Sequence, residues 1–295
     1  MNLPNSYKPK FSIVIPTYSA DVLLMECIQS LCQQSGDKNG LEVIVVNDGG
    51  RKEISEKLDL FESQLVIRYF YQENKGPATA RNLGIKKARG DIVLFLDDDS
   101  LPTPNWVQTT INTWGKYHDY DGIGGYIKSD EKDSIYCRVN ADFFNWYLAH
   151  YSAHDSHTFI STCNAGYKKC ILNKVGNFDE GFKNASGEDR DLNIKLLNSG
   201  AKLMLDRNIL VYHDRDLTLG TFAKKYLNYG RAANKIYRRY PELKGLSVKD
   251  YFNMYLSILK NYRTSWKKII AFLLITLSQV CTIVGHHKSM LFKKK

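Results

Sequence analysis

Motifs that would assign the chain to several common functional classes are missing from its 295 residues. No GxGxxG follows the first apolar run and no GxxxxGKS/T occurs anywhere, which disfavours a dinucleotide-binding Rossmann domain and a P-loop NTPase. The six cysteines form no CxxC pair and no Cys/His set with zinc-finger spacing. The polar segment Met1–Lys10 has no apolar signal sequence, so we expect a reducing, cytosolic compartment for the main domain.

Acidic residues are scarce in the C-terminal third, whereas the whole chain has a formal net charge of +10. From Arg215 onward there are 17 Lys and Arg against 3 Asp and Glu, while residues 1–214 have 24 basic and 28 acidic residues. Such a basic segment suits nucleic acid or anionic lipid. It contains an uncharged run, residues 269–285, directly after a Trp-Lys-Lys sequence, which favours lipid. The sequence therefore predicts a membrane-surface partner and no nucleic acid.

The length of this uncharged run leaves its relation to a membrane open. At about 1.5 Å per residue, 17 residues are marginal for a hydrocarbon core of about 30 Å. Lysines lie at both ends, and lysines prefer the cytosolic side, so an in-plane or re-entrant helix is favoured over a single span. A buried core helix or a dimer helix is the alternative without a membrane.

Three consecutive carboxylates, Asp97, Asp98 and Asp99, follow the short apolar run Ile92–Leu96, which is typical of a buried strand. Adjacent carboxylates repel one another unless a cation or ligand neutralises them. Their oxygens suit hard divalent ions such as Mg²⁺ or Mn²⁺, and ligands bind at the carboxyl ends of strands in open α/β sheets. We expect a Mg²⁺ or Mn²⁺ site here, with a solvated acidic turn as the alternative.

Strand and helix patterns alternate along the first hundred residues, which predicts an α/β fold with a mostly parallel sheet flanked by helices. The predicted strands are 11–15, 41–46, 65–71, 92–96, 121–127, 201–205 and 209–212. The predicted helices are 21–34, 52–63, 77–89, one beginning at Gly187, and then 218–240, 247–263 and 269–285, which form a C-terminal helical extension. The aromatic residues of 139–151 indicate either core packing or an acceptor groove.

Several segments, in register, resemble family 2 glycosyltransferases with the GT-A (nucleotide-diphospho-sugar transferase) fold. They are PTY after the first strand, NDGG after the second, NKGPATARNLGIKKARGD, FLDDD, and the later CNAGYKKCILNKVGNFDEGF and GEDRDLNIKLLNSG. The resemblance implies a catalytic domain over 1–215, with a nucleotide-sugar-binding half at 10–106 and an acceptor half at 107–215. Residues 216–295 are then a basic helical extension, as in bacterial-type members with a membrane-associated C-terminus.

The resemblance implies transfer of a sugar from a nucleoside diphosphate sugar, such as a UDP-sugar, to a hydroxyl, with inversion at the anomeric carbon. Asp99 is then the direct metal ligand, with Asp97 and His213 completing the metal site. Residues implied to bind the donor are Pro16, Thr17, Tyr18, Asp48, Arg81, Asp97 and Asp98.

Inversion requires a base that takes the acceptor proton. Asp189 in GEDRDL matches the family's base, and Asp191 is its rival. Glu188 and Asn164 are the residues expected to bind the acceptor. Acidic residues in a first helical turn also interact favourably with the helix dipole, which is the structural alternative for this segment.

The combined prediction is a membrane-associated, metal-dependent transferase with its catalytic domain in the cytoplasm. Its partners would be a nucleoside diphosphate sugar and a glycan or lipid-linked acceptor, in the synthesis of a surface or lipid-linked polysaccharide. The alternatives are a polyprenyl-phosphate sugar synthase, which changes the acceptor, and a nucleotidyltransferase, although PTYSADV lacks the usual phosphate loop.

Overall fold

The structure is a computed structural model that describes residues 9–18, 21–36, 38–153, 158–183 and 186–291. The chain divides into two compact units, and each is described by itself. The first comprises residues 1–127 and 151–213, and the second comprises residues 128–150 and 214–295.

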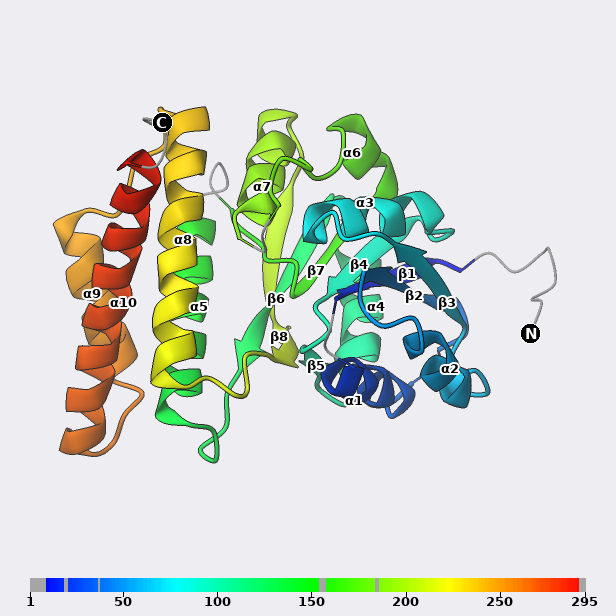
Figure 1. The fold of residues 1–295 in the computed structure, drawn as a ribbon, viewed down its shortest axis with the longest axis horizontal. Coiled ribbons are helices and arrows are strands. Elements are labelled where there is room, and N and C mark those ends of the chain that lie inside the picture. The colour runs from blue at the N-terminus through cyan, green and yellow to red at the C-terminus, as the bar shows by residue number, and fades with distance from the viewer. Residues whose placement is uncertain (1–8, 19–20, 37, 154–157, 184–185, 292–295) are drawn as a thin grey trace. The chain divides into compact units, whose positions relative to one another are not determined.

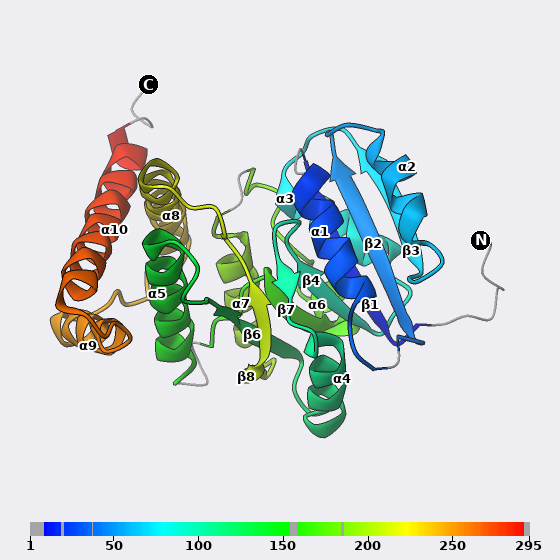
Figure 2. The same ribbon diagram turned by 90° about the horizontal axis from the view of Figure 1, so that it is seen from below.

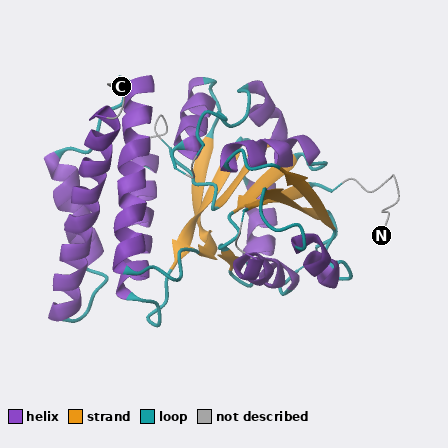
Figure 3. Ribbon diagram, in the orientation of Figure 1, coloured by secondary structure: helices purple, strands orange, loops and turns teal. Residues whose placement is uncertain are grey.

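The first unit is built on one sheet, drawn in orange in Figure 3. Its strands are β1 (Phe11–Thr17), β2 (Leu41–Asp48), β3 (Ile67–Gln72), β4 (Ile92–Leu96), β5 (Leu101–Pro102), β6 (Gly122–Lys128), β7 (Asn164–Lys168) and β8 (Leu203–Tyr212). Their order across the sheet is β3-β2-β1-β4-β7-β6-β8-β5. The α/β fold class expected from the sequence is confirmed.

The sheet changes direction at β4. Strands β3, β2, β1 and β4 pair in parallel, as the alternating pattern predicts. Beyond them, β4 pairs with β7, β7 with β6, and β8 with β5, all antiparallel. The parallel half places the carboxyl ends of β1, β2 and β4 along one edge, where ligands bind in open α/β sheets.

Helices cover both faces of this sheet and enclose two apolar cores (Figure 1). One core packs α1 (Asp21–Cys32), α2 (Ile54–Leu58) and α4 (Trp106–Lys116) on side chains such as Ile13 and Val43. The other packs α3 (Pro77–Lys87), α6 (Lys169–Lys174) and α7 (Glu188–Asn198) on side chains such as Val14 and Ile44. Successive strand residues face opposite cores, so apolar runs without alternation identify strands buried on both sides.

The second unit is helical. Its helices are α5 (Ile135–Ser152), whose last two residues belong to the first unit, α8 (Leu219–Arg239), α9 (Val248–Leu259) and α10 (Ser265–Leu291). Helices α8 and α10 lie side by side in both views (Figures 1 and 2). Buried Phe222, Tyr226 and Ile275 belong to the core of this unit, and Phe143 of α5 packs on Tyr226 with the ring centroids 5.5 Å apart.

Several predicted elements have other bounds in the structure. The two short strands expected at 201–205 and 209–212 are one strand, β8, because the polar residues Asp206–Asn208 between them stay extended, with Arg207 and Asn208 exposed. The helix expected at 269–285 is longer, Ser265–Leu291. Residues 128–150 pack with the C-terminal helices, although we expected them within the catalytic domain.

Candidate active site

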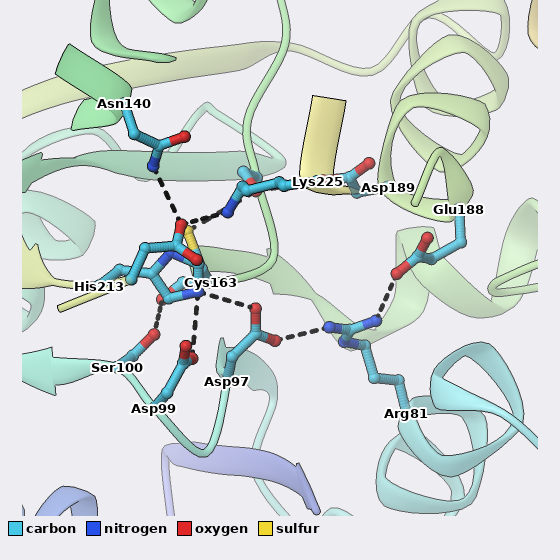
Figure 4. Close-up of polar contacts among 12 residues, drawn as sticks. Arg81, Asp97, Asp99, Ser100, Asn140, Cys163, Glu188, Asp189, His213 and Lys225 are labelled. Atoms are coloured by element: carbon cyan, nitrogen blue, oxygen red, sulfur yellow. Dashed lines mark hydrogen bonds and ion pairs between the residues drawn. The ribbon is translucent and has the colours of Figure 1, made fainter. Parts of the chain in front are cut away.

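The carboxylates that end β4 lie in a cluster with the imidazole that follows β8. Nε2 of His213 is 3.1 Å from Oδ1 of Asp99 and 3.5 Å from Oδ2 of Asp97 (Figure 4). One atom from each of the three residues lies within 4.8 Å of the others. The side chains of Asp97 and Asp99 are 27% and 31% exposed, so a ligand can reach the cluster.

Strand pairing explains why His213 meets residues more than a hundred positions earlier. Ser100 donates its N–H to the carbonyl of Asp97, which turns the chain after β4, and β5 follows immediately. β5 pairs antiparallel with the end of β8, with Leu101 opposite Tyr212. The residue after Tyr212 therefore lies beside the turn that contains the carboxylates.

The charged partners around these carboxylates are not equivalent. Burial alone would raise the pKa of Asp97, but Arg81 and then His213 hold this pKa well below its usual range. Burial, and after it Asp99 and Asp97, raise the pKa of Asp98 to about 7, although Thr17 donates a hydrogen bond of 2.7 Å to Oδ2 of Asp98. Negative charge is thus concentrated at this strand end.

This donor set fits a divalent cation. Two carboxylates and one imidazole nitrogen converge on one point, and a third carboxylate lies next to them. Oxygen ligands with one imidazole suit Mn²⁺ or Mg²⁺. Burial is the main reason that the pKa of Asp98 is raised, and a cation would relieve the repulsion from Asp99 and Asp97 that adds to it. The three residues expected to hold the metal, Asp97, Asp99 and His213, are therefore brought together.

Arg81 joins the strand-end cluster to α7. Its Nη2 donates to Oδ1 of Asp97 at 2.6 Å, and its Nη1 donates to Oε1 of Glu188 at 2.8 Å (Figure 4). The side chain is 3% exposed, and its two carboxylate partners raise its pKa above the usual range despite burial. The donor role expected for Arg81 is thus accompanied by a buried bridge between two acidic clusters, which the sequence did not indicate.

The predicted base, Asp189, lies in the first turn of α7. The helix begins directly after Gly187, whose φ of 89° is in the left-handed region that favours glycine. Ser161 donates a hydrogen bond of 3.1 Å to Oδ2 of Asp189, and the backbone N–H of Arg190 donates to Oδ1. Burial first, and Glu188 second, raise the pKa of Asp189 to about 7, which suits a base that works near neutral pH.

The other two acidic residues of this turn are more enclosed. Asp191 is 0% exposed, whereas Asp189 is half-buried, so access favours Asp189 over its rival. Glu188 is 3% exposed and its Oε1 accepts from Arg81. In this conformation Glu188 offers no surface to an acceptor, so the acceptor role expected for it stays a prediction.

The residues expected to contact the nucleoside line the ends of β1 and β2. Asp48 is buried, and its carboxylate accepts the N–H groups of Lys75 and Gly76 and the amide of Gln72, which ties β2 to the start of α3. Tyr18, half exposed, follows Pro16 and Thr17 at the end of β1.

The glycines of NDGG permit the close approach of these two strand ends. A Cβ at Gly50 would lie 1.7 Å from the carbonyl oxygen of Tyr18, and Gly49 has a φ of 88°. The motif that the sequence reading assigned to donor binding is therefore needed for the backbone as well.

Asn164 has a structural role in this conformation. It is 2% exposed, its Oδ1 accepts from the indole of Trp106 at 2.8 Å, and its Nδ2 donates to the carbonyls of Tyr126 and Ile209. These hydrogen bonds engage both the oxygen and the nitrogen of the side-chain amide. The acceptor-binding role expected for Asn164 stays a prediction.

The sequence reading missed Ser161 and Asn193. Asn193 donates to the backbone carbonyls of Asp189 and Ile160, and so ties the first turn of α7 to the segment that contains Ser161. The spacing of Asn193, four residues after Asp189 on one helix, was the available signal. Nothing in the sequence placed Ser161 beside α7.

Solved structures with similar folds include nucleotide-sugar enzymes. A mannosyltransferase from Pyrobaculum calidifontis in complex with GDP-Man and Mn²⁺ aligns with a TM-score of 0.70, at 14% identity, over 98% of this chain and 89% of that chain. Staphylococcus aureus TarS, residues 1–349, in complex with UDP, aligns with a TM-score of 0.55, at 17% identity, over 96% and 91%. These similarities establish the fold.

Sequence comparison identifies the family. The chain is 31% identical over 228 residues to an uncharacterized glycosyltransferase of Rickettsia typhi, covering 72% of this chain and 67% of that protein. It is 28% identical over 235 residues to chondroitin synthase of Escherichia coli, covering 68% of this chain but only 34% of that protein. Residues 12–176, more than half of the chain, match the family described as Glycosyl transferase family 2. The chain belongs to this glycosyltransferase family.

Proposed function

We propose that this glycosyltransferase is metal-dependent and inverting, and that it moves a sugar from a nucleoside diphosphate sugar to a hydroxyl of a glycan or lipid-linked acceptor. The observation that carries the proposal is the pairing of two acidic clusters through Arg81. One cluster, with Asp97, Asp99 and His213, has the ligands for a divalent cation, and the other has Asp189, whose pKa is raised to about 7.

The strand-end cluster is suited to the leaving group. Asp99, Asp97 and His213 would hold Mg²⁺ or Mn²⁺, with Asp98 beside them. A bound divalent cation neutralises the charge that develops on a departing diphosphate. Asp98 and Thr17, joined by their hydrogen bond, would line the donor side of this site. Binding of the nucleoside by Pro16, Tyr18 and Asp48 belongs to the same proposal.

Asp189 would act on the acceptor. Inversion needs a base on the face of the sugar opposite the leaving group, and the carboxylate takes the proton of the attacking hydroxyl at its Oδ atoms. Burial first, and Glu188 second, disfavour the ionised form of Asp189, while Arg81, the N–H of Arg190 and Ser161 favour it. The result is a carboxyl group poised between its two protonation states near neutral pH.

The comparisons support the general class of donor and acceptor. The two similar structures were solved with GDP-Man and with UDP, which supports a nucleoside diphosphate sugar as donor. Chondroitin synthase and hyaluronan synthase are among the relatives, which supports a growing glycan as acceptor. Helix α10 contains a segment, Ser265–His287, with the length and composition of a membrane span, although a core helix passes the same test. We include membrane association in the proposal, with the catalytic unit in the cytoplasm, where nucleotide sugars are made.

A donor screen tests the proposal. Thermal unfolding of the full chain is followed with a panel of nucleoside diphosphates and their sugars, each with and without Mn²⁺. We expect one nucleotide to raise the unfolding temperature only when Mn²⁺ is present, and Asp99→Asn to lose this effect. Stabilisation that is equal with and without the metal would contradict the metal site, and no stabilisation by any nucleotide would contradict the donor class.

A further inference from the structure

Helix α10 has two faces of different character. One face packs inside the second unit through buried residues that include Ala271, Leu274, Ile275 and Ser278. The opposite face is also apolar, but it is 37–61% exposed. Its residues are Trp266, Ile269, Phe272, Leu273, Val280, Ile283 and Val284. Contiguous exposed apolar patches are rare on soluble proteins unless they bind a partner or a membrane.

Helix α9 extends this surface. The Tyr255 ring packs on Phe272 with centroids 5.2 Å apart, and its hydroxyl is 3.0 Å from Oγ1 of Thr276. On either side of Tyr255, Phe252 and Leu256 are exposed. We call Phe252 and Leu256 of α9, together with the seven exposed residues of α10, the apolar face.

The charge around the apolar face favours an anionic lipid surface as its partner. Between residues 242 and 291 there are seven basic and two acidic residues, and 269–285 has none. Lys260, Arg263 and Lys268 are exposed where α9 meets α10, beside the half-exposed Trp266. Trp and Lys next to an apolar helix face are typical of the membrane interface. Parallel pairing of α10 with a second copy would bring the same positive charges together, whereas an anionic surface would neutralise them.

The packing of α10 on α8 determines how the helix can meet a bilayer. A Cβ at Gly230 would lie 2.0 Å from the carbonyl oxygen of Thr282, and a Cβ at Gly285 would lie 2.1 Å from that of Leu227. The two backbones are therefore in direct contact. If α10 spanned the bilayer with this packing intact, α8 would have to enter the bilayer with it. The exposed Lys224 and Arg231 of α8 lie close to its contact with α10, so they would enter too. Charged side chains facing lipid are rare and costly within a membrane.

We propose that α10, with α9 beside it, lies in the plane of an anionic membrane, with the apolar face inserted at the level of the headgroups and α8 outside the hydrocarbon core. The inference deepens the membrane association in the proposed function, but it requires no particular sugar chemistry. It assigns one partner surface to this chain and excludes a bilayer span by α10.

Vesicle flotation of the full chain tests the partner. Deleting α10 would expose the buried core of the second unit, so point substitutions at exposed positions are used. We expect the chain to float with phosphatidylglycerol vesicles more than with phosphatidylcholine vesicles. The pair Ile269→Glu and Leu273→Glu should lower the bound fraction by about tenfold or more. Leu60→Glu, at an exposed apolar position in the first unit, is the control and should float like the original chain.

A depth measurement distinguishes an in-plane helix from a span. Ile269→Cys, Leu273→Cys and Ile283→Cys are labelled one at a time with an environment-sensitive fluorophore, with the exposed Cys170 replaced by Ser. Lipids brominated at different acyl positions then report depth. We expect the same shallow depth at all three sites. A deep site at 273, with 269 and 283 in opposite leaflets, would overturn the in-plane arrangement.

Two further outcomes would overturn the proposal. One is equal flotation of the Glu pair and the original chain. The other is a dimer in light scattering that the Glu pair abolishes, since the apolar face would then bind a second copy. Asp189→Asn is measured in parallel, and it should bind vesicles normally while losing sugar transfer. Lipid binding and catalysis can therefore fail independently, so a wrong function would not be mistaken for a wrong surface.

Discussion

The two acidic clusters of the first unit have similar composition and different surroundings. Each offers three carboxylates within a few residues, one at the end of β4 and one in the first turn of α7. The strand-end carboxylates Asp97 and Asp99 are about a third exposed and meet an imidazole. In α7, Glu188 and Asp191 are almost completely buried, and Asp189 is the accessible one. Neighbours and access, rather than the number of charges, distinguish the proposed cation site from the proposed catalytic base.

The guanidinium of Arg81 contacts one carboxylate of each cluster. It lowers the pKa of Asp97, yet Asp189, one residue beyond its other partner, keeps a raised pKa. The buried guanidinium of Arg81 therefore keeps Asp97 ionised, whereas Asp189 can still exchange a proton near neutral pH.

The largest effect is expected at the strand-end cluster. Asp99→Asn keeps the size of the side chain but removes a ligand charge, so sugar transfer and Mn²⁺-dependent donor binding should be lost while the fold survives. Transfer assays, calorimetry with the donor, and thermal melting measure the three properties. Asp119→Asn, an exposed carboxylate of the same unit, is the control and should transfer normally. A near-normal rate in Asp99→Asn would mean that the cluster is not the metal site.

The next effect is expected in α7. Asp189→Asn should bind the donor normally but lose about 10²–10⁴ in kcat, the usual contribution of a general base. Single-turnover kinetics at saturating donor and metal measure the loss. If Asp191→Asn, correctly folded by circular dichroism, loses more in kcat, the base assignment moves to Asp191. Weaker donor binding with normal turnover would instead make Asp189 a donor ligand.

Breaking the link between the clusters should affect stability. Arg81→Gln leaves Asp97 and Glu188 without their shared cation, and removal of one partner from a buried ion pair typically costs about 3–5 kcal/mol. Denaturant unfolding measures this loss. The control is Lys57→Gln, which breaks a surface pair with Asp21 and should cost at most about 1 kcal/mol. Equal costs for both variants would show that the bridge contributes no more than a surface contact.

The smallest effect concerns pH. The pKa of Asp189 is raised to about 7. Below pH 7 the carboxyl group is therefore largely protonated and cannot take the proton of the acceptor's hydroxyl. At saturating Mn²⁺, kcat should therefore rise through about pH 7 and level off above it. Ser161→Ala removes a hydrogen bond that favours the ionised form, so the midpoint should move to higher pH. A midpoint that moves to lower pH, or a flat profile from pH 5.5 upward, is the contrary result.

Sequence patterns predicted the parallel half of the sheet well because its signals are local. Runs such as Ile92–Leu96 are buried on both faces and read as strands without tertiary information. The glycine and proline that start α3 likewise act within a few residues. The antiparallel half was not foreseen, because the pairing of β4 with β7 joins residues about seventy positions apart and no local pattern encodes it.

The same limit applies to single residues. Asn164 stands in a segment that resembles the acceptor side of the family, but in the fold its amide holds β6, β7 and α4 together. Ser161 gave no signal at all, yet it contacts the expected base. Residues 128–150 read as part of the catalytic domain, and only their packing shows that they belong with the C-terminal helices.

The sequence by itself determined the strand that ends in Asp97–Asp99, the helix that begins at Glu188, and the apolar run at 269–285. Each of these features is encoded by neighbouring residues within a single helix or strand. The tertiary structure alone decided that Arg81 joins both clusters and that α10 buries one face on α8 and exposes the other, and it gives the contact between His213 and Asp99 that the family resemblance had implied. These outcomes depend on which distant surfaces meet, because burial and charge partners are properties of the packed chain and not of its local pattern.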